Sequence, residues 1–146
     1  MRMSTVTRRF RDLDGIIDDV HELFDACSER DTFCPPLTEH GLERARLAVH
    51  EWLANLVQHA EFDDREPEVT LNISTEQQRL RCTIEDNSKG FDIGPHLETM
   101  PGVLETFPER GMGFMMLKSL TADLSYRRCE DKDRYCLDFF VDPKHG

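Results

Sequence analysis

The sequence predicts an α+β fold, a two-layer sandwich in which a mixed, mostly antiparallel sheet carries helices on one face. Apolar residues recur every three or four positions up to residue 60, which is typical of helices, and alternate with polar residues afterwards, which is typical of strands. The predicted strands occur in neighbouring pairs joined by short polar turns, which favours antiparallel pairing. A chain of 146 residues is expected to form one domain over 1–146.

Two helices are predicted before residue 61. The N-terminal helix covers 14–28, where the apolar residues follow helical spacing. Pro35 and Pro36 interrupt the pattern, and Thr38 with Glu39 is expected to cap a second helix that runs to about Ala60. The second helix carries a longer apolar stripe, formed by Leu42, Ala45, Val49, Trp52, Leu53, Leu56 and Ala60.

Four strands and a third helix are predicted in the second half of the chain. The strands cover 69–73, 80–84, 124–129 and 135–141, with turns at 74–78 and 130–133. A third helix is expected over 111–122. Residues 87–110 show no sustained period, and loops of that length in compact domains are commonly functional.

The composition limits the class of protein. A net charge of −11, spread along the chain, disfavours direct binding to nucleic acid, which needs a basic face. No apolar run is long enough to cross a membrane and no secretion signal is visible, so a cytoplasmic protein is expected. The five cysteines show no zinc-ligand spacing and favour reduced structural thiols; they are Cys27, Cys34, Cys82, Cys129 and Cys136.

A row of polar residues lies on the second predicted helix. Glu51, Asn55 and His59 are spaced four residues apart, so they form one line beside the apolar stripe. Such a row at the border of a buried face can look into a cleft. Taken alone, however, it is better interpreted as a solvated helix flank, and a functional interpretation needs support elsewhere.

Two glycine-containing segments supply that support. Residues 85–92 (EDNSKGFD) end a predicted strand, where an acidic side chain can accept a hydrogen bond from an exocyclic amine and a glycine lets backbone approach a ligand. Residues 109–114 (ERGMGF) open the third predicted helix, whose first N–H groups suit a phosphate. Each segment alone is also typical of an ordinary turn or a loop-to-helix junction.

In this order and at these separations, the three segments resemble the N, G1 and G2 boxes of the GHKL (Bergerat-fold) ATPases. The N box covers 43–60, the G1 box 85–92, the lid 93–109 and the G2 box 109–114. The stretch 51–60 is similar to the N box of the anti-sigma-factor serine-protein kinases, a family with a histidine-kinase-like ATPase domain. The resemblance extends over about residues 10–142.

The resemblance implies a role for each N-box residue. Asn55 would chelate Mg²⁺ on the ATP phosphates, since one amide oxygen with phosphate oxygens and waters suits this ion. Glu51 would be the catalytic general base, and His59 would line the phosphate side.

The resemblance also assigns the remaining ATP-binding residues. Asp86 would bind the adenine amino group. The other members would be Ser88, Gly90 and Phe91 around the base, and Arg110, Gly111, Met112 and Gly113 at the phosphates. Three departures from the family pattern stand out, and one of them is that the lid has few glycines. Ser88 replaces a glycine, which is expected to lower affinity, and Cys136 or a neighbour occupies the region where a threonine is common.

By the same resemblance, the protein is expected to be an anti-sigma factor and serine-protein kinase of a partner-switching module. It would use ATP and Mg²⁺, phosphorylate a STAS-domain anti-sigma-factor antagonist, bind a sigma factor and form a homodimer. The alternative is a non-catalytic regulator that binds a partner under nucleotide control. The ATP-binding part of a two-component histidine kinase is less favoured, because no phospho-accepting helix precedes the domain, and His21 is better interpreted as structural.

Overall fold

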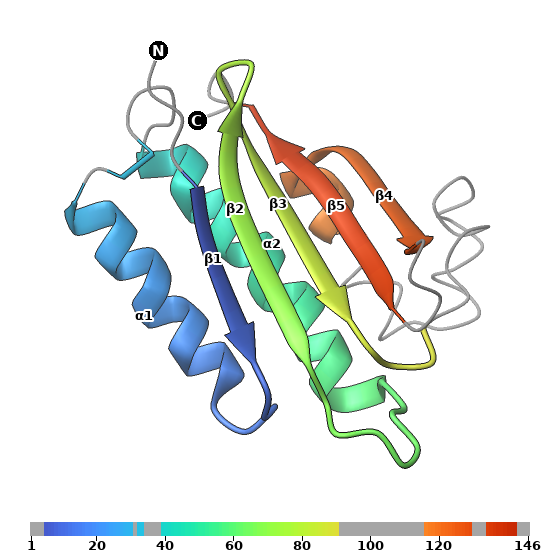
Figure 1. Cartoon of the computed structure of the whole chain (residues 1–146). Helices are drawn as coiled ribbons and strands as arrows, with labels where there is room; N and C mark the ends of the chain where they lie inside the picture. The colour runs from blue at the N-terminus through green and yellow to red at the C-terminus, as the bar shows by residue number, and fades with distance from the viewer. Residues whose placement is uncertain (1–4, 31, 34–38, 91–115, 130–133, 143–146) are drawn as a thin grey trace.

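The structure is a computed structural model that describes residues 5–30, 32–33, 39–90, 116–129 and 134–142 (Figure 1). Five strands form one sheet in the order β1-β2-β3-β5-β4, and each neighbouring pair is antiparallel. The elements are β1 (Thr5–Phe10), α1 (Ile16–Glu29), α2 (Glu39–His59), β2 (Val69–Glu76), β3 (Arg79–Asp86), β4 (Ala122–Arg128) and β5 (Tyr135–Val141). The predicted α+β class is confirmed.

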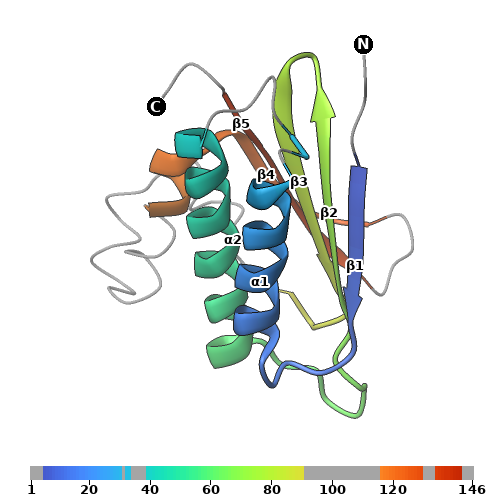
Figure 2. The same cartoon turned by 90° about the vertical axis from the view of Figure 1, so that its left-hand side faces the viewer.

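Both helices pack on the same face of the sheet (Figure 2). The alternation in β2, β3 and β5 turns every second side chain toward the helices, and α2 supplies Trp52, Leu53 and Leu56 from the other side. These three side chains are at most 1% exposed. The two layers are therefore held together by apolar burial along the stripe that the sequence predicts.

Strand β1 was not predicted. It pairs with β2 along its whole length, from Thr5 opposite Ser74 to Phe10 opposite Val69. Its sequence TVTRRF is short and basic, and most of its side chains are exposed, with only Val6 and Phe10 packed against the core. Such an edge strand has little internal periodicity, so a partner distant in sequence decides that it forms.

The β2–β3 turn is tighter than the predicted 74–78. The two strands continue to Glu76 and from Arg79, which pair with each other, so only Gln77 and Gln78 connect them. Both glutamines have positive φ angles, 52° and 65°, as two-residue hairpin turns of type I′ require. Glutamine is not a usual signal for this turn, which is why the strands were predicted too short.

The third predicted helix is only partly described. Residues 116–120 are helical, and β4 begins at Ala122, two positions before the predicted strand. The predicted helix start at 111–115 and the turn at 130–133 lie outside the described residues. In the described part of the chain, no helix has the length and apolar character needed to span a membrane.

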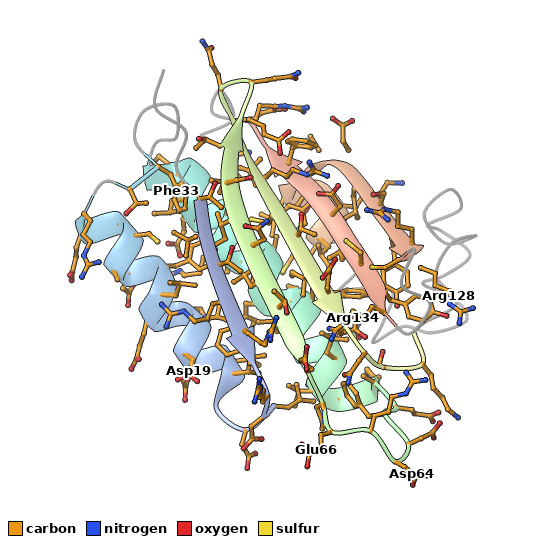
Figure 3. The ribbon with its side chains drawn as sticks, in the orientation of Figure 1. Asp19, Phe33, Asp64, Glu66, Arg128 and Arg134 are labelled. Carbon is orange, nitrogen blue, oxygen red and sulfur yellow. The ribbon has the colours of Figure 1, made fainter. Side chains whose placement is uncertain are left out.

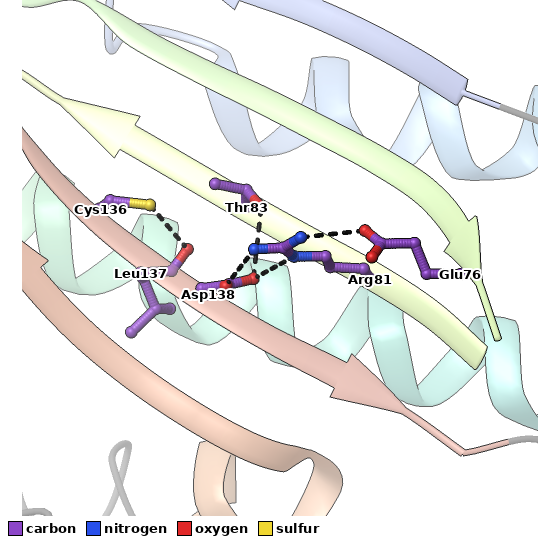
Figure 4. Close-up of polar contacts among 6 residues, drawn as sticks. All are labelled: Glu76, Arg81, Thr83, Cys136, Leu137 and Asp138. Carbon is purple, nitrogen blue, oxygen red and sulfur yellow. Dashed lines mark hydrogen bonds and ion pairs between the residues drawn. The ribbon is translucent and has the colours of Figure 1, made fainter. Parts of the chain in front are cut away.

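The sheet face opposite the helices is polar. The Arg81 guanidinium donates two hydrogen bonds to Asp138, of 2.9 and 2.7 Å, and a third of 3.0 Å to Glu76 (Figure 4). The Thr83 hydroxyl donates to the same aspartate at 3.3 Å. The bidentate pair connects β3 to β5 across this face, a geometry in which an arginine–carboxylate pair is strong.

The described cysteines form no disulfide, as expected for reduced thiols. Cys27, Cys82, Cys129 and Cys136 are all free. Burial raises the pKa of the Cys27, Cys82 and Cys136 thiols, that of Cys136 to about 12. These three therefore carry little thiolate at neutral pH and are poor nucleophiles.

Candidate functional site

The polar row predicted on the second helix lies on α2. Glu51, Asn55 and His59 are all half-buried, whereas Trp52 beside them is fully buried. In the part of the chain that the structure describes, the side chains of Glu51 and Asn55 have no hydrogen bond or ion pair. Among the described residues, this carboxylate and this amide, one helical turn apart, have no partner and could both contact a ligand in the space beside them.

The described part of the G1 box, residues 85–90, contains a buried carboxylate. Asp86, the last residue of β3, has no exposed surface. Its Oδ1 accepts hydrogen bonds from the Ser88 N–H at 2.9 Å and from the Ser88 hydroxyl. The Gly90 N–H donates in turn to the Ser88 hydroxyl oxygen at 3.0 Å. One carboxylate oxygen thus organises the turn at residues 86–90, called the G1 turn below.

The other oxygen of this carboxylate has no partner among the described residues. Asp86 Oδ2 is buried and has no hydrogen-bond partner in the described structure. Burial raises the pKa of Asp86, while the hydrogen bonds from Ser88 and the charge of Arg134 oppose that rise. A buried acceptor without a partner costs about 1–3 kcal/mol, so a ligand N–H that reaches it gains this energy. The predicted contact with an adenine amino group fits this oxygen.

Ser88 is built into the turn rather than strained by it. It does not belong to the described residues with positive φ, so its backbone does not require glycine. Its side chain is 1% exposed, and its hydroxyl both donates to Asp86 and accepts from Gly90. The geometric reason for expecting lower affinity is therefore absent; the affinity itself stays a prediction.

Replacing Ser88 by alanine is expected to lower the free energy of unfolding by about 1–3 kcal/mol. The Gly90 N–H loses its acceptor, and Oδ1 of the buried Asp86 loses one of its two donors. Urea unfolding followed by circular dichroism measures the loss. Ser119→Ala is the control, because this exposed hydroxyl makes only a local bond to the Met116 carbonyl. Equal stability of the two variants would contradict the prediction.

An aromatic column supports the G1 turn. Tyr135 pairs with Asp86 across β5 and β3, and its ring lies against Gly90. A Cβ atom added to Gly90 would lie 2.5 Å from the Tyr135 Cζ atom. It stacks on Tyr126 with ring centroids 5.6 Å apart, and Tyr126 lies 5.2 Å from Trp52 of α2. The column thus connects the turn to the helix that carries the polar row.

The β3–β5 register shows which residue of β5 lies beside Asp86, the residue predicted to bind the base. The sequence analysis left Cys136 or a neighbour in that place. Cys136 pairs with Glu85, whereas Tyr135 pairs with Asp86. Because directly paired residues share a sheet face, Cys136 points away from the helices and Tyr135 is the residue beside Asp86. Sequence reasoning missed Tyr135 since this register is not visible in a local pattern.

The connection from α2 to β2 forms hydrogen bonds with the G1 turn. Asn87 accepts from the Glu68 N–H at 2.8 Å and donates to the Glu66 carbonyl at 2.9 Å, and the Lys89 N–H donates to the Glu61 carbonyl at 2.8 Å. Figure 3 shows Glu66 in this connection, below the end of β3. The C-terminal end of α2 and the G1 turn are therefore brought to the same end of the molecule.

A charged pair closes the same end of the sheet. Arg134, at the start of β5, donates to Glu68 at 2.6 Å, and Figure 3 places this arginine beside the end of β3. The hydrogen bond from Arg134 lowers the pKa of Glu68. The pair keeps a cation near the buried Asp86 carboxylate, whose ionised form it favours.

The sequence of this chain matches a known protein family. The model of the histidine kinase-like ATPase domain matches residues 19–139, from α1 to β5. The chain belongs to this family. Membership in this ATPase family implies ATP binding, and the match includes both the polar row and the G1 turn. Several predicted site residues lie outside the described residues, so their roles stay predictions. They are Phe91, Arg110, Gly111, Met112, Gly113 and the lid 93–109.

The chain is also similar to curated proteins of one kind, the serine-protein kinases named RsbW. The chain is 30% identical over 90 residues to the serine-protein kinase RsbW of Bacillus cereus strain ATCC 10987 / NRS 248, covering 57% of this chain and 54% of the relative. The RsbW protein of Bacillus thuringiensis strain Al Hakam is 29% identical with the same coverage. The chain spans about half the length of the curated relatives it matches. The relationship is distant.

Proposed function

We propose that this ATPase domain is a serine-protein kinase and anti-sigma factor of a partner-switching module. It transfers phosphate from ATP to a serine of a STAS-domain anti-sigma-factor antagonist, and it binds a sigma factor. The proposal is supported by the family membership and by the similarity to proteins named serine-protein kinase. The observation that carries the ATP site is the buried Asp86 carboxylate with one oxygen left for a ligand.

Asp86 selects adenine because its Oδ2 oxygen accepts a hydrogen bond that the amino group of adenine can donate. Asp86 Oδ2 accepts the exocyclic amino N–H, while Oδ1 stays engaged by Ser88. Guanine carries an oxygen where adenine carries this amine, and that oxygen would face a buried acceptor. ATP is therefore preferred over GTP, because two acceptors cannot share a hydrogen bond.

The phosphate end lies along α2. Asn55 would hold Mg²⁺, which supplies neutralisation of phosphate charge when bound. Glu51, one turn away, accepts the proton of the substrate serine hydroxyl. The serine oxygen forms a bond to the γ-phosphorus as the bond to the bridging β,γ-oxygen breaks, and ADP leaves. His59, one turn further along the row, contributes on the phosphate side.

Glu51→Ala is expected to lower phosphate transfer by a factor of about 100 or more and to leave ATP affinity unchanged, because general-base contributions have this size. Asn55→Ala is expected to weaken binding of Mg-ATP itself. Mass spectrometry of a STAS-domain protein incubated with this chain and Mg-ATP measures transfer, and calorimetry measures affinity. Gln58→Ala, exposed on the same helix but outside the row, is the matched control.

The same assay separates the kinase from a non-catalytic regulator. Absence of phosphoserine on the STAS protein, together with intact and nucleotide-dependent binding of that partner, would rule out the kinase and support the regulator. Normal transfer by Glu51→Ala would show that the base assignment is wrong. A homodimer in the cytoplasm is part of the proposal, and sedimentation of the purified chain with and without ATP tests the dimer.

A further inference from the structure

Three potential metal ligands, from β3, β5 and the residue after β4, meet on the face of the sheet opposite the helices. Glu85 of β3 pairs directly with Cys136 of β5, and Cys129 follows the last residue of β4. The two sulfur atoms and a Glu85 carboxylate oxygen all lie within 4.8 Å of one another. The Cys129 N–H donates to the Arg134 carbonyl at 2.8 Å, which fixes the backbone of this cysteine at the hairpin end.

The position of this cluster separates it from the nucleotide site. Asp86 points toward the helix side, so its chain neighbour Glu85 points to the opposite face. Figure 4 shows Cys136 on β5 two positions before Asp138, whose side chain belongs to the polar network on that same face. The cluster and the Asp86 carboxylate are thus on opposite sides of the same two paired strands.

We propose that Glu85, Cys129 and Cys136 form a binding site for a thiophilic divalent cation of the Zn²⁺ class. In tetrahedral zinc sites with bonds of about 2.3 Å to sulfur and 2.0 Å to oxygen, neighbouring ligand atoms are about 3.5–3.8 Å apart. The Cys129 sulfur is already 3.8 Å from Glu85 Oε1. Small side-chain rotations bring the third ligand to the same separation, and water takes the fourth position.

Ligand type and local charge both select this class of cation. Two thiolates favour Zn²⁺ over Mg²⁺, which prefers oxygen ligands, so the site is chemically distinct from a magnesium site on α2. Arg127 pairs with Cys136 in the β4–β5 register and lies on the same face. Its charge offsets the excess negative charge of two thiolates and one carboxylate around a divalent ion. Cys82 is excluded as a ligand because it points into the core on the other face.

Cobalt substitution of the full chain tests the site. Co²⁺ added to reduced, metal-free protein is expected to bind once per chain and to produce sulfur-to-cobalt charge-transfer absorption, which added Zn²⁺ removes. Cys129→Ser and Cys136→Ser are each expected to weaken Co²⁺ binding at least about tenfold and to reduce the absorption. Glu85→Gln is expected to weaken binding but to keep the sulfur absorption.

Cys27→Ala is the matched control, since Cys27 is a buried thiol of α1 far from the cluster in the fold, and its Co²⁺ binding should equal that of the wild type. Circular dichroism checks folding; Cys129 is half-exposed at a hairpin end, so its variant remains informative if Cys136→Ser unfolds. Wild-type protein without charge-transfer absorption, or absorption retained at full strength in Cys129→Ser, would overturn the proposal. So would a chain that binds no Co²⁺ and instead forms a Cys129–Cys136 disulfide on oxidation. None of these readouts depends on phosphate transfer.

Discussion

Asp86→Asn is expected to weaken ATP binding by roughly one to two orders of magnitude, because it turns a buried acceptor into a buried donor. The asparagine oxygen can replace Oδ1 and keep both hydrogen bonds from Ser88. Its NH₂ group then occupies the place of Oδ2 and faces the adenine amine, so two donors oppose each other. The turn stays intact while the contact that selects the base is lost.

Isothermal titration of the wild type and the variant with ATP measures this effect. Asp138→Asn is a matched control, since this carboxylate holds Arg81 on the opposite face of the sheet and is expected to affect stability without changing ATP affinity. Wild-type affinity in Asp86→Asn would show that this carboxylate does not contact the base.

The same variant has a defined pH signature. The pKa of Asp86 is raised in the folded chain above its ordinary value of 3.8, chiefly by burial. Its ionised form therefore destabilises the fold above the folded pKa, and this penalty disappears as the pH falls below 3.8. The free energy of unfolding of Asp86→Asn minus that of the wild type should rise with pH above 3.8 and become constant above the folded pKa. A difference that falls with pH would contradict the raised pKa.

Gly90→Ala is expected to lower the free energy of unfolding by roughly 2–5 kcal/mol, the sum of a backbone cost and a steric cost. Gly90 has a φ angle of 82°, a conformation that costs an alanine about 1–2 kcal/mol. An added Cβ would also lie 2.5–2.7 Å from three atoms of the Tyr135 ring. The ring is held by its stack on Tyr126, so it has little freedom to withdraw.

Gly15→Ala separates the two costs. Gly15 has a φ angle of 75° but nothing within 4 Å of its Cβ position, so alanine there meets only the backbone cost. Denaturant unfolding of both variants is expected to show Gly90→Ala as the more destabilised, and adding Tyr135→Ala should reduce the effect of Gly90→Ala to that of Gly15→Ala. Equal losses at the two glycines in the wild-type background would show that the Tyr135 ring can move aside.

Local periodicity was enough for much of the fold and for part of the site. The stripe from Leu42 to Leu56 predicted α2, and the alternation in 69–73 and 80–84 predicted the hairpin at the centre of the sheet. The placement of Glu51, Asn55 and His59 on one helix also follows from spacing alone, because a helix turns by a constant angle per residue. The alternation in 80–84 likewise placed Asp86 at the end of a strand and Gly90 in the turn after it.

Contacts between segments far apart in sequence decided the rest. Strand β1 exists because β2 offers it a partner, and Tyr135 faces Asp86 only because of the β3–β5 register. The sequence analysis found no zinc-ligand spacing, since Glu85, Cys129 and Cys136 approach one another only when three strands pair. The local periodicity of the sequence predicts on which face of its own strand or helix a residue lies. Which residue it meets there depends on pairing and packing, and those determine the buried oxygen, the aromatic column and the thiol cluster.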